Sequence, residues 1–219
     1  LLLDICENRD CDLAICAYED FSGNDINWKK DISDSNITFE KSTDTLNAIF
    51  SPRNVETIVV WNKMYKMDNI RDIHFTEGRI FEDEAISARL IYSADRVGRI
   101  DAPLYYYYQN DSGTMGGEFT LKKLDILWAL EDRMDFFKEK ELTALYQKDS
   151  YKYMCKLLTH YYRVMHMKPN HPEIATDIME KYRKKRKESL EFGWSKKRNM
   201  AMRLFGIFPG LYPVITKKY

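Results

Sequence analysis

Three consecutive acids, Glu82, Asp83 and Glu84, open an apolar segment of the chain, RIFEDEAISARL (residues 79–90). A carboxylate in a cleft can accept a proton from a hydroxyl group, and acidic neighbours raise its pKa towards the range in which it acts as a base. The acids also have a structural explanation, because negative side chains in the first turn of a helix complement the helix dipole. Both interpretations remain open from composition alone. Adjacent helical residues point in different directions, so at most two of these acids can share one cleft.

The cysteines and histidines lack the spacing of a metal site. His160 and His166 are six positions apart, which does not stack them on one helix face. Zinc ligands normally include at least one recognisable close pair. The cysteines form no CxxC pair, and we interpret them as buried or incidental thiols of a reducing compartment; they are Cys6, Cys11, Cys16 and Cys155. We therefore predict no metal site in this chain.

Charge is balanced overall but unevenly distributed along the 219 residues, which carry 34 Lys and Arg and 34 Asp and Glu. Residues 181–219 hold 12 basic and 2 acidic side chains, a net charge of +10, so residues 1–180 carry −10. One interpretation of the tail, residues 194–219, is a packed helix with a solvated basic face. The alternative is an interfacial segment on anionic lipid. Nothing in the tail indicates base reading or stacking, so we predict no nucleic-acid partner.

The elements around the acids predict an α/β fold. Residues 12–18, DLAICAY, are typical of a buried strand, and a second β-like run begins at residue 55. Between Ile80 and Ala94 apolar residues recur every four positions, which predicts a helix with one apolar stripe.

Residues 96–109 predict two short strands, interrupted at Asp101-Ala102-Pro103. Four consecutive tyrosines, residues 105–108, follow the interruption. Because side chains alternate across a strand, we expect two of these tyrosines to face the core.

The remainder of the chain predicts helices. Apolar residues step by three and four in three segments: Leu127, Leu130, Met134 and Phe137; Met154, Leu157, Leu158, Tyr161 and Met165; and Ile174, Ile178 and Tyr182. We place a boundary near Gly117. The predicted parts are an α/β part (1–117), a mainly helical region (118–193) and the basic aromatic tail (194–219).

Four motifs within residues 59–115 together resemble family 2 glycosyltransferases, the GT-A-fold enzymes that build bacterial surface polysaccharides. In order they are WNKMY (61–65), FTEG (75–78), EDE (82–84) and IDAPLYYY (100–107). The order and spacing match the second half of the family's catalytic domain. The resemblance implies a partial GT-A-like mixed sheet with flanking helices, followed by a mainly helical C-terminal region.

The resemblance also implies roles for individual residues. Asp83 corresponds to the aspartate usually assigned as the catalytic base, and Glu82 would line the same acceptor cleft. Trp61 would be a platform for a sugar face, although a packing role between helix and sheet is an equal alternative. Lys63, with Asn62, we interpret as a polar support on the acceptor side.

A loop over the donor diphosphate is expected near Gln109 and Ser112. This chain departs from the family there, because Tyr108 stands where a basic residue is usual and Ser112-Gly113 replaces an Asn-Ser pair. The contact that closes over the donor therefore departs from the family pattern, and Gln109 is our candidate for it.

The nucleotide-binding half of such an enzyme, with its metal-binding Asp-x-Asp, is expected before residue 12 and is not in this sequence. Asp10-Cys11-Asp12 spells the motif but precedes a strand, whereas ligands converge at the carboxyl ends of strands in open α/β sheets. We therefore interpret it as a chance match. We expect the chain to be part of a longer protein, to be inactive alone, and to need Mg²⁺ or Mn²⁺ only in the intact parent.

The sequence thus predicts part of an inverting glycosyltransferase that uses a nucleotide-sugar donor and a glycan or lipid-linked acceptor. The alternative is a non-catalytic glycan-binding or assembly module that retains the acceptor half of the fold. We expect a cytoplasmic protein, with the tail as a hypothesis for attachment to the inner face of the plasma membrane. An unpaired sheet edge leaves homo-oligomerisation open.

Overall fold

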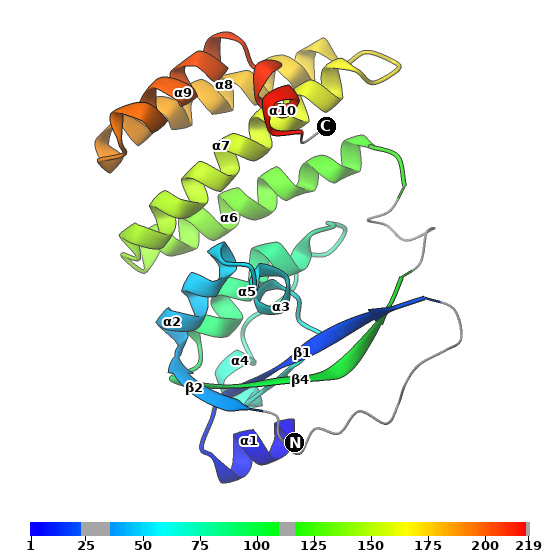
Figure 1. The fold of residues 1–219 in the computed structure, drawn as a ribbon, viewed down its shortest axis with the longest axis vertical. Helices are drawn as coiled ribbons and strands as arrows, with labels where there is room; N and C mark the ends of the chain where they lie inside the picture. Colours follow the sequence, from blue (N-terminus) through cyan, green and yellow to red (C-terminus); the bar gives the residue numbers. More distant parts are fainter. Residues whose placement is uncertain (23–35, 110–116, 218–219) are drawn as a thin grey trace. The chain divides into compact units, whose positions relative to one another are not determined.

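The fold is known from a computed structural model, which describes residues 1–22, 36–109 and 117–217 (Figure 1). The chain divides into two compact units, Leu1–Glu118 and Phe119–Tyr219. The division falls one residue after the boundary expected at Gly117, and the basic tail belongs to the second unit. No helix in the described part of the chain is long and apolar enough to cross a membrane.

A four-stranded mixed sheet organises the first unit. Its order is β2-β4-β1-β3, with β1 and β4 parallel and the two outer strands antiparallel to their neighbours. The α/β class predicted from the sequence is confirmed. The strands are β1 (Leu13–Phe21), β2 (Ile37–Lys41), β3 (Lys63–Tyr65) and β4 (Arg96–Tyr108).

Helices cover both faces of this sheet. Figure 1 shows α1 on one side and α2, α3 and α5 on the other. The first-unit helices are α1 (Leu2–Asn8), α2 (Ser42–Asn47), the 3-10 turn η1 (Ala48–Phe50), α3 (Asn54–Ile58), α4 (Met67–Ile70) and α5 (Glu82–Tyr92).

Helix α1 packs closely on the sheet because β4 presents a glycine beneath it. A Cβ atom on Gly98 would lie 2.3 Å from Cγ2 of Ile5, far inside van der Waals contact. Ile5 is fully buried and joins Ala14, Cys16 and Ile100 in an apolar cluster on this side of the sheet. Any larger residue at position 98 would therefore displace α1.

The predicted helix at 80–94 is present as α5, and its apolar stripe is confirmed. Ile86, Leu90 and Ala94 are all buried. The three acids occupy the first turn of this helix, as the sequence predicted.

The β-like run that begins at residue 55 is helical instead. It forms α3, and the strand that follows is the three-residue β3. Val55 is exposed whereas Thr57 and Ile58 are buried, which is the distribution of a short helix with one inward face. Short apolar runs of this kind do not distinguish a strand from a helix.

Residues 96–108 form one strand, so the prediction of two interrupted strands is wrong. The interruption is absorbed as a shift of register against β1, between Cys16 and Tyr18. Pro103 lies at this irregularity, where a missing backbone donor does not break the ladder. Asp101 stays in the strand because its carboxylate accepts a hydrogen bond from the Asn36 backbone at 2.8 Å.

None of the four tyrosines at 105–108 is buried, so the expectation that two face the core is wrong. They occupy the end of β4, where it extends with β1 beyond the core of the unit. Leu104 is the last residue of β4 that packs against the α1 cluster.

The second unit is helical, as predicted. Its elements are η2 (Leu121–Leu124), α6 (Asp125–Glu139), α7 (Thr143–Met165), α8 (Pro172–Glu188), η3 (Ser189–Phe192), α9 (Lys196–Ile207) and α10 (Leu211–Thr216).

The apolar stripes of α6 and α7 are buried at most of their predicted positions. Leu127, Leu130, Met134 and Phe137 are buried in α6, and Met154, Leu157 and Leu158 in α7. Met165 is exposed because it is the last residue of α7. In α8, Ile178 and Tyr182 are buried and Ile174 is partly so.

A fully buried ion pair links α6 and α7. The Arg133 guanidinium donates two hydrogen bonds to the Asp149 carboxylate, Nε to Oδ2 at 2.9 Å and Nη2 to Oδ1 at 2.8 Å. A bidentate ion pair of this kind offsets much of the free-energy cost of removing both charges from water.

Candidate active site

Asp83 occupies the second position of α5, two residues after the strained residue Phe81. Phe81 caps the helix in the left-handed region (φ 62°, ψ 31°), which is unfavourable for a side chain of this size. The strained turn fixes where the acids project. Glu82 is exposed, whereas Asp83 is half-buried and its Oδ1 accepts a hydrogen bond from the Glu84 backbone at 2.8 Å.

Burial raises the pKa of Asp83, and the charges of Glu84 and Glu82 raise it further. The hydrogen bond from the Glu84 backbone opposes this shift without cancelling it. A carboxylate with a raised pKa holds a proton more readily than a surface aspartate does, which is the property required of a general base.

Lys63 lies in electrostatic range of Asp83 but is committed to the protein. Its Nζ donates to the backbone oxygen of Glu56 at 2.6 Å, to the backbone oxygen of Val59, and to Oδ1 of Asn62 at 2.8 Å. The two carbonyls belong to the last turn of α3 and the residue after it, where carbonyls lack helical partners. Lys63 therefore caps the C-terminal end of α3.

Burial, together with repulsion from Arg99, lowers the pKa of Lys63 to about 7, and the charge of Asp83 acts in the opposite direction. A position on the acceptor side is compatible with this geometry. Because the ammonium already has three intramolecular acceptors, its described contacts are those of a support for the fold.

Asn62 is a buried support, as the sequence indicated. Its amide donates to the backbone oxygen of Cys16 at 2.7 Å and to that of Glu56 at 3.1 Å. The Cys16 backbone donates back to the Asn62 oxygen at 3.0 Å. The WNKMY motif is thereby tied to β1 on one side and to α3 on the other.

Trp61 is the centre of an aromatic cluster, which we define as Tyr18, Trp61, Tyr105 and Tyr107. The indole stacks with Tyr105 at 4.2 Å between centroids and with Tyr107 at 5.2 Å, and Tyr18 meets it edge-on at 5.1 Å. Tyr105 and Tyr107 are each 37% exposed. The packing role considered for Trp61 is thus present, and the cluster still offers aromatic surface to solvent.

The aromatic cluster lies towards the carboxyl ends of the parallel strands β1 and β4, where Tyr18 pairs with Tyr105. Ligands of open α/β sheets bind outside these ends. The position of the cluster therefore suits a ligand with apolar faces, such as a sugar ring.

Gln109 follows β4 at the same end of the sheet. Its side chain donates to Oδ1 of Asp20 at 2.6 Å, and its backbone donates to the Phe21 oxygen at 2.8 Å. These contacts hold the two strand ends together. Ser112, the other donor-loop candidate, lies outside the described residues.

The structure brings some of the predicted site residues together and leaves others apart. Trp61 and Lys63 belong to one segment, and Lys63 links that segment electrostatically to Asp83. Within the ranges described, no hydrogen bond or ring contact joins Asp83 to Trp61 or to Gln109. Glu82 is brought near Asp83 only as its neighbour in α5.

Sequence reasoning missed Arg99, which is buried in β4 beside this region. Its Nη1 lies 3.4 Å from Oε2 of Glu56 and its Nε lies 3.8 Å from Oε1 of Glu40. Its Nη2 is buried and has no hydrogen-bond partner among the described residues. The strand pattern could have indicated this residue. Side chains alternate across a strand, so residue 99 lies on the same face of β4 as the buried Val97, and a buried charge requires a partner.

Within residues 1–22, 36–109 and 117–217, no group of three or more His, Cys, Asp or Glu side chains is placed to hold a metal ion. In the Asp-x-Asp sequence at residues 10–12, the second acid, Asp12, has a structural role. Oδ2 of Asp12 accepts the Asp95 backbone N–H at 2.9 Å, at the amino end of β1 and β4.

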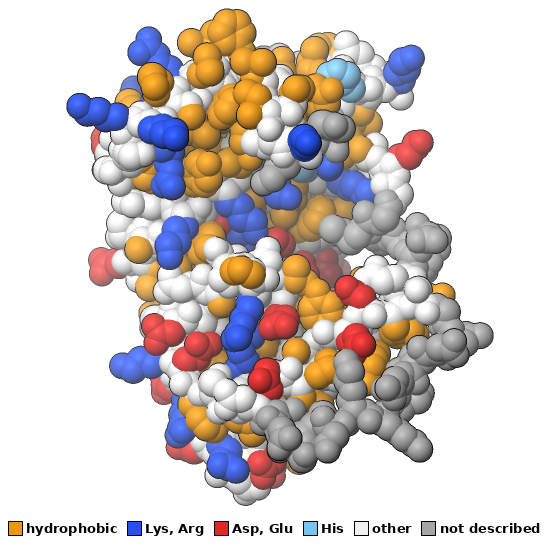
Figure 2. All heavy atoms as spheres, viewed as in Figure 1, with side chains coloured by type: hydrophobic (Ala, Val, Ile, Leu, Met, Phe, Trp, Pro, Cys, Tyr) orange, Lys and Arg blue, Asp and Glu red, His pale blue; other side chains and the backbone are white. Residues whose placement is uncertain are grey.

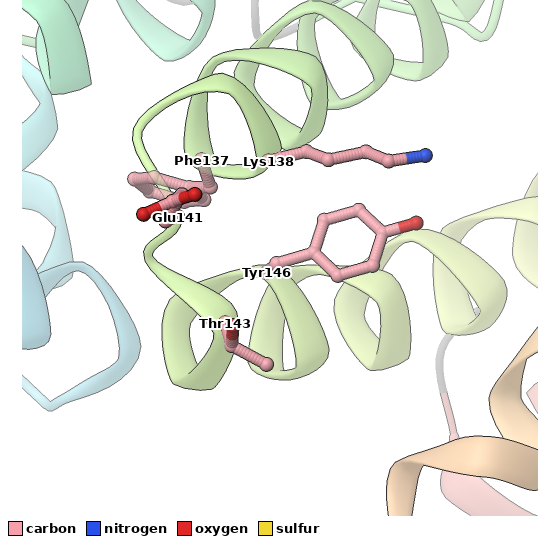
Figure 3. A pocket seen from close by; sticks show the side chains of 5 residues that line it. All are labelled: Phe137, Lys138, Glu141, Thr143 and Tyr146. Atoms are coloured by element: carbon pink, nitrogen blue, oxygen red, sulfur yellow. The ribbon is translucent and has the colours of Figure 1, made fainter.

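A pocket of about 410 Å³ lies in the second unit at the turn between α6 and α7 (Figure 3). Lys138 and Tyr146 extend in the same direction, and Phe137, Glu141 and Thr143 complete the lining nearer the turn. The Tyr146 hydroxyl donates to Glu188 and accepts from Lys185 at 3.0 Å. None of the predicted site residues lines this pocket.

Comparison with known proteins adds no assignment. No protein-family model matches the chain, and a search of curated proteins finds no match.

Proposed function

We propose that this chain forms the acceptor side of an inverting glycosyltransferase, part of a family 2 enzyme of bacterial surface polysaccharide synthesis. Asp83 is the general base in this proposal. The observation that carries it is the half-buried Asp83 at the start of α5, whose pKa is raised by burial and by its acidic neighbours.

The proposed reaction is a single displacement. The Asp83 carboxylate takes the proton of an acceptor hydroxyl as that oxygen forms a bond to the anomeric carbon. The bond from the anomeric carbon to the donor phosphate oxygen breaks, and the nucleoside diphosphate leaves with the electron pair. The Asp83 proton is later released to solvent, which restores the base.

The other residues of the first unit support this base. Phe81 sets the direction of the first turn of α5, and Lys63 closes α3 beside it. The aromatic cluster provides apolar surface at the carboxyl ends of β1 and β4 for the acceptor sugar. The donor and its Mg²⁺ or Mn²⁺ would be held by the nucleotide-binding half of the intact parent.

The test is Asp83→Asn in the full-length protein that contains this chain. The amide keeps an oxygen to accept the Glu84 backbone N–H, so folding is retained while the base is lost. We expect kcat to fall by roughly 10²- to 10⁴-fold. Glu84→Gln is the matched control, and transfer that survives Asp83→Asn would remove Asp83 from this role.

The alternative function is a non-catalytic glycan-binding or assembly module. The partly exposed tyrosines of the aromatic cluster favour it, because a stacking surface can bind sugar without a donor site. Glycan binding by the 219-residue chain, together with no donor-dependent transfer by the full-length protein, would select this alternative.

A further inference from the structure

Helix α9 packs on α8 with one side only. The Tyr182 hydroxyl donates to the Met202 backbone oxygen at 2.6 Å, and Met202 is buried. A Cβ atom on Gly206 would approach the Tyr182 ring to 3.1 Å, so this glycine lets the two helices lie close together. The inward side of α9 is therefore fixed by Met202 and Gly206.

The outward side of α9 and the surface of α10 are apolar and exposed. On α9, Met200 is 70% exposed and Ile207 is 59% exposed, with Leu204 between them on the same helix face. We define the apolar surface as the exposed residues Met200, Leu204, Ile207, Phe208, Leu211, Val214 and Ile215. Figure 2 shows hydrophobic side chains gathered in this region, with Lys and Arg beside them. A contiguous apolar patch of this kind marks an interaction site.

A basic pocket of about 460 Å³ lies between α8 and α9. Four cations line it, Arg183, Arg186 and Lys187 from α8 and Arg203 from α9, together with Leu190 and Met202. Arg203 also lies on the outward face of α9, between Met200 and Ile207. The basic pocket and the apolar surface are thus continuous.

The cations of the basic pocket have no acidic partner within the described ranges. Arg183, Lys187 and Arg203 make no ion pair there, and Arg186 donates only to the backbone oxygen of Asn199 at 3.1 Å. The Nε of Arg186 is buried without a hydrogen-bond partner among the described residues. An anionic group in the pocket would satisfy these donors.

We propose that α8, α9 and α10 form a docking surface for an anionic phospholipid bilayer. A lipid phosphate enters the basic pocket, and the apolar surface inserts at the boundary between headgroups and acyl chains. The pairing of aliphatic side chains with unpaired cations is the chemistry of that boundary.

The same features disfavour the other occupants. A second copy of the chain in a symmetric contact would oppose the same cations on each side, and like charges repel. Nucleic acid would neutralise the cations but offers no apolar environment to Ile207 or Val214. A bilayer of anionic lipid accommodates both features.

The experiment is co-sedimentation of the 219-residue chain with phosphatidylcholine vesicles that contain or lack phosphatidylglycerol. We expect binding only to the anionic vesicles, weakening as salt is added. Arg183→Glu/Arg203→Glu tests the pocket, and Met200→Ser/Ile207→Ser tests the apolar surface. Each pair should weaken the vesicle partition coefficient by about tenfold or more.

Matched controls change equivalent side chains elsewhere. Lys41→Glu/Lys168→Glu alters the net charge by the same amount, and Val55→Ser/Met67→Ser removes exposed apolar side chains of the first unit. Both should bind vesicles like the wild type. Circular dichroism checks that all variants fold.

Three results would overturn the proposal. They are wild-type binding no stronger to anionic than to neutral vesicles, unchanged binding by either test pair, and tighter binding to duplex DNA than to vesicles. A dimer detected by light scattering without vesicles, and abolished by Met200→Ser/Ile207→Ser, would instead assign the surface to self-association.

Discussion

The indole of Trp61 and the ring of Tyr105 stack with their centroids 4.2 Å apart and their planes inclined by 27°. Trp61 comes from the loop before β3 and Tyr105 from the end of β4, so the contact joins the two edges of β1 across its carboxyl end. The Trp61 side chain therefore helps to hold this end of the sheet together.

Trp61→Ala should lower the free energy of unfolding by about 2–4 kcal/mol, somewhat less than the loss of a fully buried tryptophan. Trp61→Phe should cost less than half as much, because a phenyl ring can still stack. Urea denaturation followed by circular dichroism measures both. An alanine variant as stable as the wild type would show that the indole does not support packing and would favour its role as a sugar platform.

If the protein has the proposed transferase activity, its rate should fall in acid as Asp83 becomes protonated. The carboxylate must be ionised to accept a proton, and its pKa is raised by burial and by Glu84 and Glu82. The acid limb of the profile of kcat/KM against pH should therefore have its midpoint above the ordinary value for aspartate. Asp83→Asn should abolish this limb, whereas Glu84→Gln should keep it and move it to lower pH.

The same shift predicts that Asp83 opposes folding at neutral pH. A carboxyl whose pKa is higher in the folded protein favours folding while protonated, and this contribution is lost as pH rises through the folded pKa. Asp83→Asn should thus be at least as stable as the wild type at about pH 7 while being inactive. Thermal unfolding of both proteins tests this, and a large loss of stability in the variant would contradict it.

Lys63 should make stability rise with pH above neutrality. Its pKa is about 7 in the folded chain, below the ordinary lysine value near 10.4, so the unfolded chain binds more protons between these limits. Stability therefore increases with pH across that window. Lys63→Met keeps the apolar stem and should remove this increase.

The comparison requires urea denaturation of the wild type and Lys63→Met at several pH values between about 7 and 10. The difference in unfolding free energy isolates Lys63 from the thiols and tyrosines that titrate in the same range. A constant difference between the two proteins would show that the Lys63 ammonium is not buried as described. Lys66→Met, at an exposed lysine, is the control.

Removing one partner of the Arg133–Asp149 pair should destabilise the second unit strongly. Arg133→Met leaves a buried carboxylate without its guanidinium, and Asp149→Leu leaves the reverse, each at a cost of about 3–5 kcal/mol. The double variant should recover much of this loss because no buried charge remains. Urea denaturation of the wild type, the two single variants and the double variant gives the coupling energy. Strictly additive losses would contradict the prediction.

The parts of the fold that could be predicted are those with a long repeating pattern. The apolar stripes of α5, α6 and α7 extend over several turns, and their residues are buried as expected. Residues 55–60 are too short for a pattern to separate helix from strand. Asp101-Ala102-Pro103 predicted an interruption of the strand. The prediction was wrong because the sequence does not reveal that the pairing of β4 with β1 shifts register there.

The site follows the same rule. The start of α5 at the acids was predictable from local sequence, as was the polar support from Asn62. Lys63 was likewise interpreted as a polar support, but its acceptors could not be predicted, because two of them are backbone carbonyls at the end of α3, an element that the sequence did not indicate. Arg99 meets Glu40 and Glu56 through contacts between distant segments, which periodicity along one segment cannot report.

The parallel pairing of β1 with β4 has a consequence for the order in which the chain folds. Leu13 pairs with Val97, so the central ladder of the sheet closes only after most of the first unit has been synthesised. Most contacts between helices of the second unit join consecutive helices, chiefly α6 with α7 and α7 with α8. Chains rich in sequence-local contacts fold faster than those that depend on distant pairings. The helical unit, although it follows the sheet in the sequence, should therefore acquire its structure on a shorter timescale than the sheet.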